Sequence, residues 1–190
     1  MWIYGVWRVM TDEQEWKEYK LYYRRGNVRK RGFEKISTPQ IEKDIRKYGW
    51  AEFVKKSDIK LPKRATSKSA GYDIFAIRGF KLEPNKEIKL PTGIKAYMQP
   101  DEVLKIYPRS SLGFRYYARL ANSTGLIDAD YYGNEDNEGH IWVKIRNESD
   151  EEMAIQKGEA ICQAVFQKYL LADGDSFDGD ERKGGIGSTG

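Results

Sequence analysis

The sequence predicts an all-β protein, a sandwich or jelly-roll-like β-barrel, with a short α-helical segment before it. Two observations support this prediction. From residue 61 onward, short apolar or alternating stretches recur, and Pro, Gly and Asn separate them, which is typical of strands joined by turns. Helix signals are confined to the first 60 residues, and evenly spaced strands with little helix favour a barrel or two packed sheets.

Composition divides the 190 residues into four segments. Residues 1–27 are an aromatic and charged extension of unknown role, and residues 28–60 hold a first strand and a helical insertion. Residues 61–172 form the predicted barrel core. Residues 173–190 are acidic and then glycine-rich, and we expect a mobile arm outside the core. This length suits one domain with an appendage.

Two helices are expected before the barrel. The first covers residues 11–25, with a threonine or an aspartate at its start as the cap and Gly-Asn after it as the stop. The second has the cleaner signal, with Thr38 as cap, Pro39 in the first turn, isoleucines on one face and Gly49 as its end.

Five core strands are expected, each bounded by turn residues. Alternation of apolar and polar residues or a short apolar run identifies each one. The predicted strands cover residues 72–77, 87–90, 103–107, 140–145 and 160–169.

The residue counts exclude several classes of protein. One cysteine, Cys162, and one histidine cannot make an internal disulfide or a Cys/His zinc site, which excludes the usual zinc deaminase chemistry. No stretch is long and apolar enough to cross a bilayer. The apolar opening is short and lacks the basic region of a signal peptide. We therefore expect a cytoplasmic protein without membrane contact.

The net charge of +4 is unevenly spread. Residues 1–60 carry 15 Lys and Arg against 9 Asp and Glu, whereas residues 61–190 carry 18 against 20. Trp and Tyr interleaved with Lys and Arg are able to bind nucleic acid, so residues 1–60 are a candidate surface for nucleic acid or a regulatory partner. A charge run is more often a solvated face, and both interpretations stay open.

Two motifs within residues 108–133 indicate a nucleotide site. The first, Pro-Arg-Ser-Ser-Leu-Gly, offers an arginine, two hydroxyls and glycine-flanked backbone, the set that a polyphosphate needs. The second, Gly-Leu-Ile-Asp-Ala-Asp-Tyr-Tyr-Gly, places an aspartate three residues before a tyrosine. Together they suggest a nucleotide held beside a carboxylate that activates water.

Five segments in order resemble the motifs of the trimeric all-β dUTPase family (deoxyuridine triphosphate nucleotidohydrolases), of the type found in Gram-positive bacteria or their phages. The resemblance covers about two thirds of the chain, and Arg-Gly-Phe-Glu at 31–34 loosely resembles the family's first strand. The five segments are residues 70–73, 108–113, 125–133, 158–163 and 182–190.

The resemblance implies hydrolysis of dUTP to dUMP and pyrophosphate, which keeps uracil out of DNA and supplies dUMP for dTMP synthesis. It also implies Mg²⁺ as cofactor, held by the substrate phosphates and water with no direct protein ligand. A water attacks the α-phosphate in line in such a reaction. Asp128 matches the family's water-activating aspartate, although an aspartate at this place in a turn is also a common cap.

Further positions match the family's nucleoside contacts. Tyr131 matches the tyrosine that packs against the deoxyribose and excludes a 2′-hydroxyl. Asn122 and the backbone around Gly125 match positions that bind the uracil edge, where hydrogen bonds select the base. The alternatives are a half-buried strand aromatic for Tyr131 and a plain turn residue for Asn122.

The resemblance also supplies candidate phosphate contacts. A guanidinium fork suits phosphate oxygens, although a surface ion pair is the alternative for both arginines. Asp73 resembles an aspartate that organises the site, or else it is a sheet-end carboxylate with a structural partner. The candidate phosphate-binding residues are Arg109, Ser110, Ser111, Gln163, Arg182, Gly187 and Ser188.

In the family the motifs meet across subunits, so we expect a homotrimer with shared active sites. The glycine-rich tail would close over a neighbour's site, and a disordered terminus is the alternative. Ile186 stands where the family usually has a phenylalanine that stacks on uracil. Trp142 or His140 is the candidate replacement, and a core-facing strand residue is the alternative for Trp142.

Two other functions are alternatives to dUTP hydrolysis. The first is a dCTP deaminase, a relative that shares the barrel and the Arg-Ser-Ser motif. It needs an Ile-Asp-Pro-Gly-aromatic third motif, whereas this chain has Ile-Asp-Ala-Asp-Tyr. The second is a phage regulatory protein that acts through the basic and aromatic residues 1–60.

Overall fold

The computed structural model describes residues 2–3, 6–7, 29–48, 54–177 and 184. Contacts divide the chain into two compact units, Met1–Lys30 and Arg31–Gly190. In the first unit, strands β1 (Trp2–Ile3) and β2 (Val6–Trp7) pair antiparallel. The helix expected over residues 11–25 lies outside the described residues.

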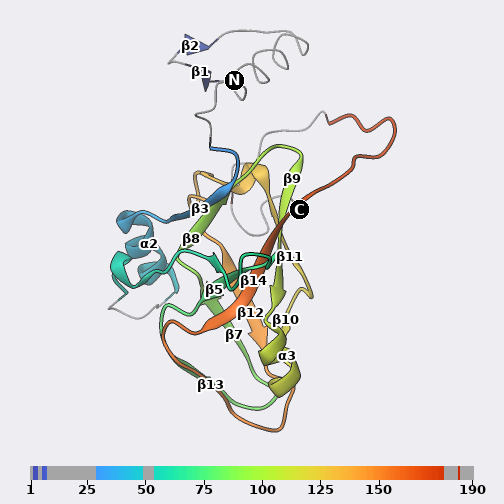
Figure 1. Cartoon of the computed structure of the whole chain (residues 1–190). Coiled ribbons are helices and arrows are strands. Elements are labelled where there is room, and N and C mark those ends of the chain that lie inside the picture. Colours follow the sequence, from blue (N-terminus) through green and yellow to red (C-terminus); the bar gives the residue numbers. More distant parts are fainter. Residues whose placement is uncertain (1, 4–5, 8–28, 49–53, 178–183, 185–190) are drawn as a thin grey trace. The chain divides into compact units, whose positions relative to one another are not determined.

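The second unit is built from antiparallel strands, and the all-β prediction is confirmed (Figure 1). A five-stranded sheet has the order β11-β9-β14-β5-β4, and a three-stranded sheet has the order β10-β12-β7. Two further pairs are β13-β6 and β3-β8. The strands are β3 (Gly32–Lys35), β4 (Lys63–Arg64), β5 (Tyr72–Phe75), β6 (Phe80–Leu82), β7 (Glu87–Pro91), β8 (Ile94–Tyr97), β9 (Glu102–Pro108), β10 (Arg119–Leu120), β11 (Gly125–Asp128), β12 (Trp142–Arg146), β13 (Met153–Ile155) and β14 (Ala160–Lys168).

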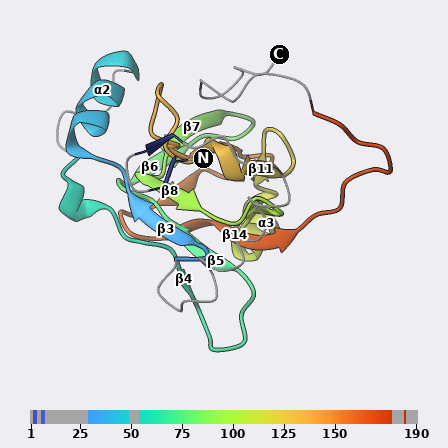
Figure 2. The same cartoon turned by 90° about the horizontal axis from the view of Figure 1, so that it is seen from above.

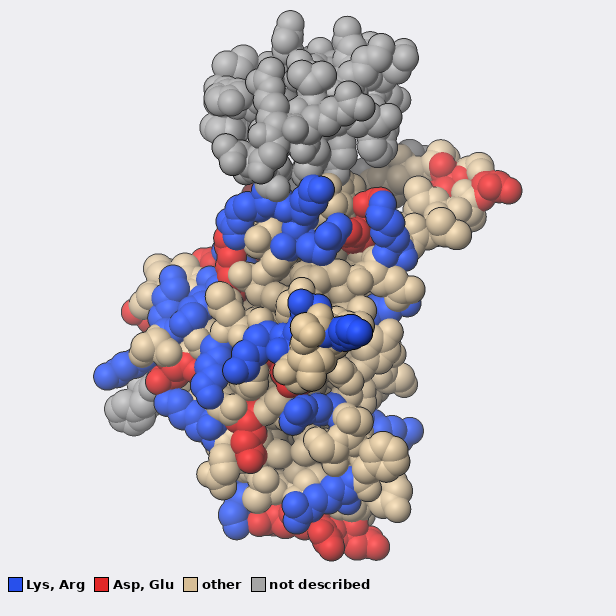
Figure 3. Space-filling view, viewed as in Figure 1, with Lys and Arg blue, Asp and Glu red and all other residues tan. Residues whose placement is uncertain are grey.

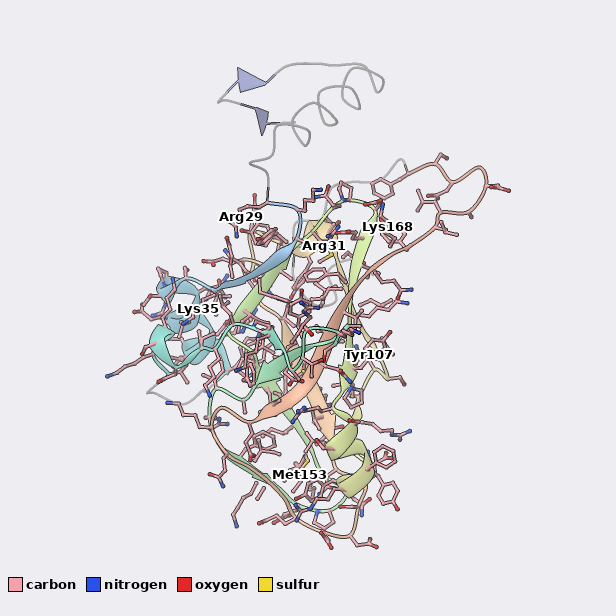
Figure 4. The ribbon with its side chains drawn as sticks, viewed as in Figure 1. Arg29, Arg31, Lys35, Tyr107, Met153 and Lys168 are labelled. Carbon is pink, nitrogen blue, oxygen red and sulfur yellow. The ribbon has the colours of Figure 1, made fainter. Side chains whose placement is uncertain are left out.

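Strand β9 is an inner strand of the larger sheet, and it pairs with β11 on one side and β14 on the other. Leu104 and Ile106 alternate into the core and are 0% and 1% exposed, as period-two patterning requires. Figure 4 shows Lys168 near the start of this strand and Tyr107 near its end. Residues that follow the end of β9 are therefore separated by the length of the strand from residues beside its start.

Helix α2 (Thr38–Tyr48) lies at the side of the strands in both views (Figure 1, Figure 2). The expected cap was Thr38, but the structure places the cap one residue earlier. The hydroxyl of Ser37 accepts a hydrogen bond from the Gln40 amide at 3.2 Å, so Thr38 is the first helical residue. Threonine and serine are both good caps, and only the backbone path distinguishes them.

A second helix in the described part of this unit, α3 (Ser110–Tyr116), was not predicted. It has seven residues and contains Gly113, which argues against a helix in isolation. It begins directly after β9 and ends where Tyr117 adopts a left-handed conformation with φ 48°. Its place between two strands, rather than its propensity, determines this turn of helix.

All five predicted strands agree with the structure within two residues at each end, and the start of β12 is an instructive difference. The alternation from His140 predicted a strand start at that residue, but β12 begins at Trp142. His140 is 2% exposed, and its ring is hydrogen-bonded to another element. His140 is thus a buried core residue that precedes the paired part of β12. Its burial extends the alternating pattern of the strand by two residues although His140 itself is not part of the strand.

Candidate active site

A candidate site is a cavity of about 650 Å³ beside strand β11. Gly125 and Asp128 bound that strand, and Tyr131 ends the 3₁₀ turn that follows it. Asn122 lies in the loop before β11, and Trp142 opens β12. The structure thus places these five predicted residues in the lining of one cavity.

Tyr131 is fixed in this cavity by hydrogen bonds at its hydroxyl. The hydroxyl donates to the backbone carbonyl of His140 at 3.0 Å and accepts from Asn137 Nδ2 at 2.8 Å. The residue is 5% exposed, so the polar end of the ring is satisfied inside the protein. The ring therefore offers a rigid apolar wall to whatever occupies the cavity.

His140 does not line the cavity, unlike Trp142. Its Nδ1 lies 2.6 Å from Asp44 Oδ2, and its Nε2 accepts a hydrogen bond from the Gly93 amide at 2.9 Å. Burial lowers the pKa of His140 although Asp44 opposes this shift. The amide donor requires an unprotonated Nε2, so the imidazole is neutral and structural. Trp142 is the stacking candidate that the geometry favours.

A second group of predicted residues lies where β5, β9 and β14 meet. Arg109 Nε is 3.3 Å from Asp73 Oδ1, and Asp73 pairs in register with Gln163. A Cβ at Gly71 would lie 2.5 Å from Gln163 Oε1, so the glycine of the first motif makes room for this amide. These contacts bring two predicted phosphate-binding residues, Arg109 and Gln163, together with the predicted site-organising Asp73.

Ser110 and Ser111 follow Arg109 as the first residues of α3, and both are exposed. Their hydroxyls are accessible beside the arginine. The predicted residues of the C-terminal segment, Arg182, Gly187 and Ser188, lie outside the described residues.

Asp128 and Arg109 lie at opposite ends of β9. Asp128 pairs with Val103, whereas Pro108, which precedes Arg109, pairs with Cys162. Five residues of extended strand separate Val103 from Pro108, which corresponds to about 17 Å. The proposed base and the proposed phosphate-binding arginine of one chain therefore cannot contact the same phosphate group.

Sequence reasoning missed two lysines in the cavity wall, Lys89 and Lys144. They stand directly opposite each other on β7 and β12. Like charges in this position repel unless other groups compensate. Lys144 forms an ion pair with Glu87, and the Lys89 ammonium lies over two aromatic rings. Only the strand register could have shown that these lysines meet.

The described surface has mixed charge. Lys and Arg side chains are spread over the face drawn in Figure 3, and Asp and Glu lie between them. In the basic cluster at residues 29–31, Arg31 is bound to Glu102, which is only 4% exposed. Arg31 therefore serves at least as a structural partner, and binding of nucleic acid by residues 1–60 stays a prediction.

Comparison with known proteins identifies the family. The family model for dUTPase matches residues 57–190. The chain is 50% identical over 137 residues to the deoxyuridine 5′-triphosphate nucleotidohydrolase of Lactococcus lactis, covering 72% of this chain and 91% of that protein. The chain belongs to the dUTPase family.

Further relatives agree with this membership. The nucleotidohydrolase of Finegoldia magna is 34% identical over 145 residues, covering 73% of this chain and 97% of that protein. The crystal structure of dUTPase from Streptococcus mutans superposes with a TM-score of 0.59 at 37% identity, covering 75% of this chain and 99% of that one. The dUTPase from phage phi11 of S. aureus shares the fold, with a TM-score of 0.57 at 17% identity over 80% of this chain and 99% of that one.

The protein is thus an enzyme that hydrolyses dUTP, and the prediction made from the five motifs is confirmed at this level. A third motif without Pro-Gly already favoured hydrolysis over dCTP deamination. Within the described residues, no helix is long and apolar enough to cross a membrane.

Proposed function

We propose that the enzyme cleaves dUTP in active sites shared between the subunits of a homotrimer, releasing dUMP and pyrophosphate. The separation of Asp128 from Arg109 along β9, about 17 Å, is the observation that supports the shared site. A triphosphate bound to the arginine of one chain needs the nucleoside cavity of another. A closed threefold arrangement supplies three equivalent sites of this kind.

In this proposal the cavity beside β11 binds the deoxyuridine. The amide of Asn122 and the backbone at Gly125 bind the uracil edge, and the ring of Tyr131 packs against the sugar. Trp142 stacks on the base in place of the phenylalanine that Ile186 replaces. Stacking of an aromatic side chain on a base contributes about 1–3 kcal/mol. In this proposal Trp142 supplies the stacking energy that the usual phenylalanine would supply at position 186.

The second group of residues binds the phosphates. Arg109 reaches the phosphate oxygens while Asp73 holds its guanidinium at 3.3 Å. The hydroxyls of Ser110 and Ser111 and the amide of Gln163 add uncharged donors. Arg182 and Ser188, with the backbone at Gly187, complete the site from the C-terminal segment.

We infer that Mg²⁺ enters with the triphosphate. Within the described residues no group of three or more His, Cys, Asp or Glu side chains is placed to hold a metal ion. Phosphate oxygens and water are the hard ligands that Mg²⁺ prefers, and in this proposal Asp73 orders that water shell. When bound, the ion neutralises charge on the phosphates. A relative from phage phi11 is described with a structural Mg(II) ion.

Asp128 performs the proton transfer in this mechanism. Its carboxylate accepts a proton from a water molecule, and the water oxygen forms a bond to the α-phosphorus. The bond from that phosphorus to the bridging oxygen breaks, and pyrophosphate leaves. A positioned carboxylate base contributes about 10²–10⁴-fold in rate.

A pyrophosphate-release assay with dUTP, dCTP, dTTP and UTP in the presence of Mg²⁺ tests the proposal. Asp128→Asn should lose about 10²–10⁴-fold of the dUTP activity. Asp130→Asn is the matched control, because this carboxylate does not line the cavity. Equal activity of wild type and Asp128→Asn would overturn the mechanism. Release of ammonia from dCTP would instead indicate a deaminase.

A further inference from the structure

Helix α2 carries two buried polar side chains that connect it to the cavity wall. Gln40 and Asp44 are 6% and 4% exposed. Gln40 Nε2 donates to Asp44 Oδ1 at 3.0 Å, and Asp44 Oδ2 lies 2.6 Å from His140 Nδ1. Burial of a carboxylate is unfavourable unless it is paired and hydrogen-bonded. These contacts therefore fix the helix to one particular residue of the chain before β12.

The residue that α2 holds stands between the two aromatic walls of the cavity. The backbone carbonyl of His140 accepts the hydroxyl of Tyr131 at 3.0 Å, and Trp142 follows two residues later. The rings of His140 and Trp142 have centroids 5.0 Å apart. A displacement of His140 would therefore move both Tyr131, which is proposed to pack against the sugar, and Trp142, which is proposed to stack on the base.

Tyr48, the last residue of α2, contacts Trp142 directly. The Tyr48 ring lies edge-on to the Trp142 ring, with centroids 4.9 Å apart and an angle of 61°. The Lys89 ammonium lies 4.5 Å from the centroid of the Tyr48 ring and 4.8 Å from that of Trp142. Edge-to-face and cation–π contacts of this kind are attractive. Trp142 is therefore held by three neighbours while it lines the cavity.

We propose that Tyr48 is a positioning residue for nucleoside binding, which orders Trp142 in the cavity wall before the substrate arrives. This inference rests on the proposed stacking role of Trp142. Helix α2 ends before residue 57, where the match to the family model begins. The residue that supports Trp142 thus lies outside residues 57–190, the part of the chain that matches the family model.

The physical gain is preorganisation. A tryptophan that is free to rotate loses side-chain entropy when a base stacks on it, whereas an ordered one has already lost it. Removing the Tyr48 ring should therefore weaken binding without affecting the proton transfer at Asp128. We expect the KM for dUTP to rise about three- to tenfold, with kcat unchanged.

The experiment measures KM and kcat for the full-length enzyme with dUTP and Mg²⁺. Tyr48→Ala should raise KM, whereas Tyr48→Phe, which keeps the ring, should retain the wild-type KM. Arg46→Ala is the control for the helix itself, because Arg46 is exposed on the same helix and alanine favours helix. A wild-type KM for Tyr48→Ala would overturn the inference.

A double-variant comparison separates the failure of this inference from that of the stacking proposal. If Tyr48 acts through Trp142, Tyr48→Ala should have no further effect on KM in a Trp142→Ala background. An equal rise in both backgrounds would show that Tyr48 acts elsewhere and would overturn the inference. A Trp142→Ala enzyme with the wild-type KM would overturn the stacking proposal and, with it, this role of Tyr48.

Discussion

The separation of the two site halves makes a quantitative prediction about mixed trimers. Arg109→Ala removes the proposed phosphate ligand and Asp128→Ala removes the proposed base, so each variant alone should be nearly inactive. Within one chain about 17 Å of strand separates the two positions. In the proposed trimer each active site takes Asp128 from one subunit and Arg109 from a neighbour. In trimers assembled from equal amounts of both variants, each intact residue is present with a chance of one half. About one quarter of all sites in the mixture should therefore be complete. In trimers that contain both variants the fraction is about one third, because one of the three interfaces of every such trimer combines the two intact residues.

The assay is pyrophosphate release by mixed trimers. The two variants are co-expressed with different affinity tags, purified on both tags and compared with wild type at equal protein concentration. Trimers that combine Asp128→Ala with Asp128→Asn should stay inactive, and trimers that combine wild type with Asp128→Ala should keep partial activity. If the Arg109 and Asp128 mixture stays at the level of its parents while the wild-type mixture is active, the shared site is refuted.

Three further predictions concern the support of the site. The single histidine, His140, should titrate in NMR below the ordinary imidazole pKa, because burial lowers the pKa of its ring. Below pH about 6.5 the unfolded chain then binds more protons than the folded chain. The contribution of His140 to the free energy of unfolding is therefore complete above that pH and is lost as the pH falls below it. An unshifted or raised pKa would contradict this prediction. Gly139→Ala should lower the free energy of unfolding by about 1–3 kcal/mol, because φ is +83° and the new Cβ would lie 2.6 Å from a backbone oxygen. Gly113→Ala, where nothing lies within 4 Å, is its control in denaturant unfolding, and equal losses would refute the steric explanation. Arg31→Ala should cost about 1–3 kcal/mol because buried Glu102 loses its charged partner, and Arg31→Ala with Glu102→Gln should recover part of that loss; a single variant as stable as wild type would show that the pair is unimportant.

The sequence predicts five of the strands well because turn residues bound them and because the period of two is simple, whereas shorter strands such as β6, β10 and β13 were not predicted. Leu104 and Ile106 show the pattern clearly, and β9 differs from its predicted range by one residue at each end. Helix α3 could not be predicted in the same way. Seven residues with an internal glycine have weak helix propensity, and the contacts that fold them come from other parts of the chain.

The motifs indicated the residues of the site but not their grouping. Asp128, Tyr131 and Asn122 line one cavity, while Arg109 and Asp73 pair elsewhere, and only strand register shows the distance between the groups. His140 was a stacking candidate because of its position after the third motif. Its partner Asp44 is 96 residues away in the sequence, so no local pattern could show that the imidazole is buried and satisfied.

The change at position 186 and the helical insertion are physically connected in this interpretation. An aliphatic Ile186 cannot stack on a base as a ring does, so the predicted role of the C-terminal segment is limited to phosphate binding by Arg182 and Ser188. The stacking ring must then come from the cavity wall, where Trp142 is the candidate. A wall residue at the start of a strand is free to adopt several rotamers unless neighbours restrict it. The contact from Tyr48 supplies that restriction, which gives the inserted helix a role in substrate binding although it lies outside the matched family region.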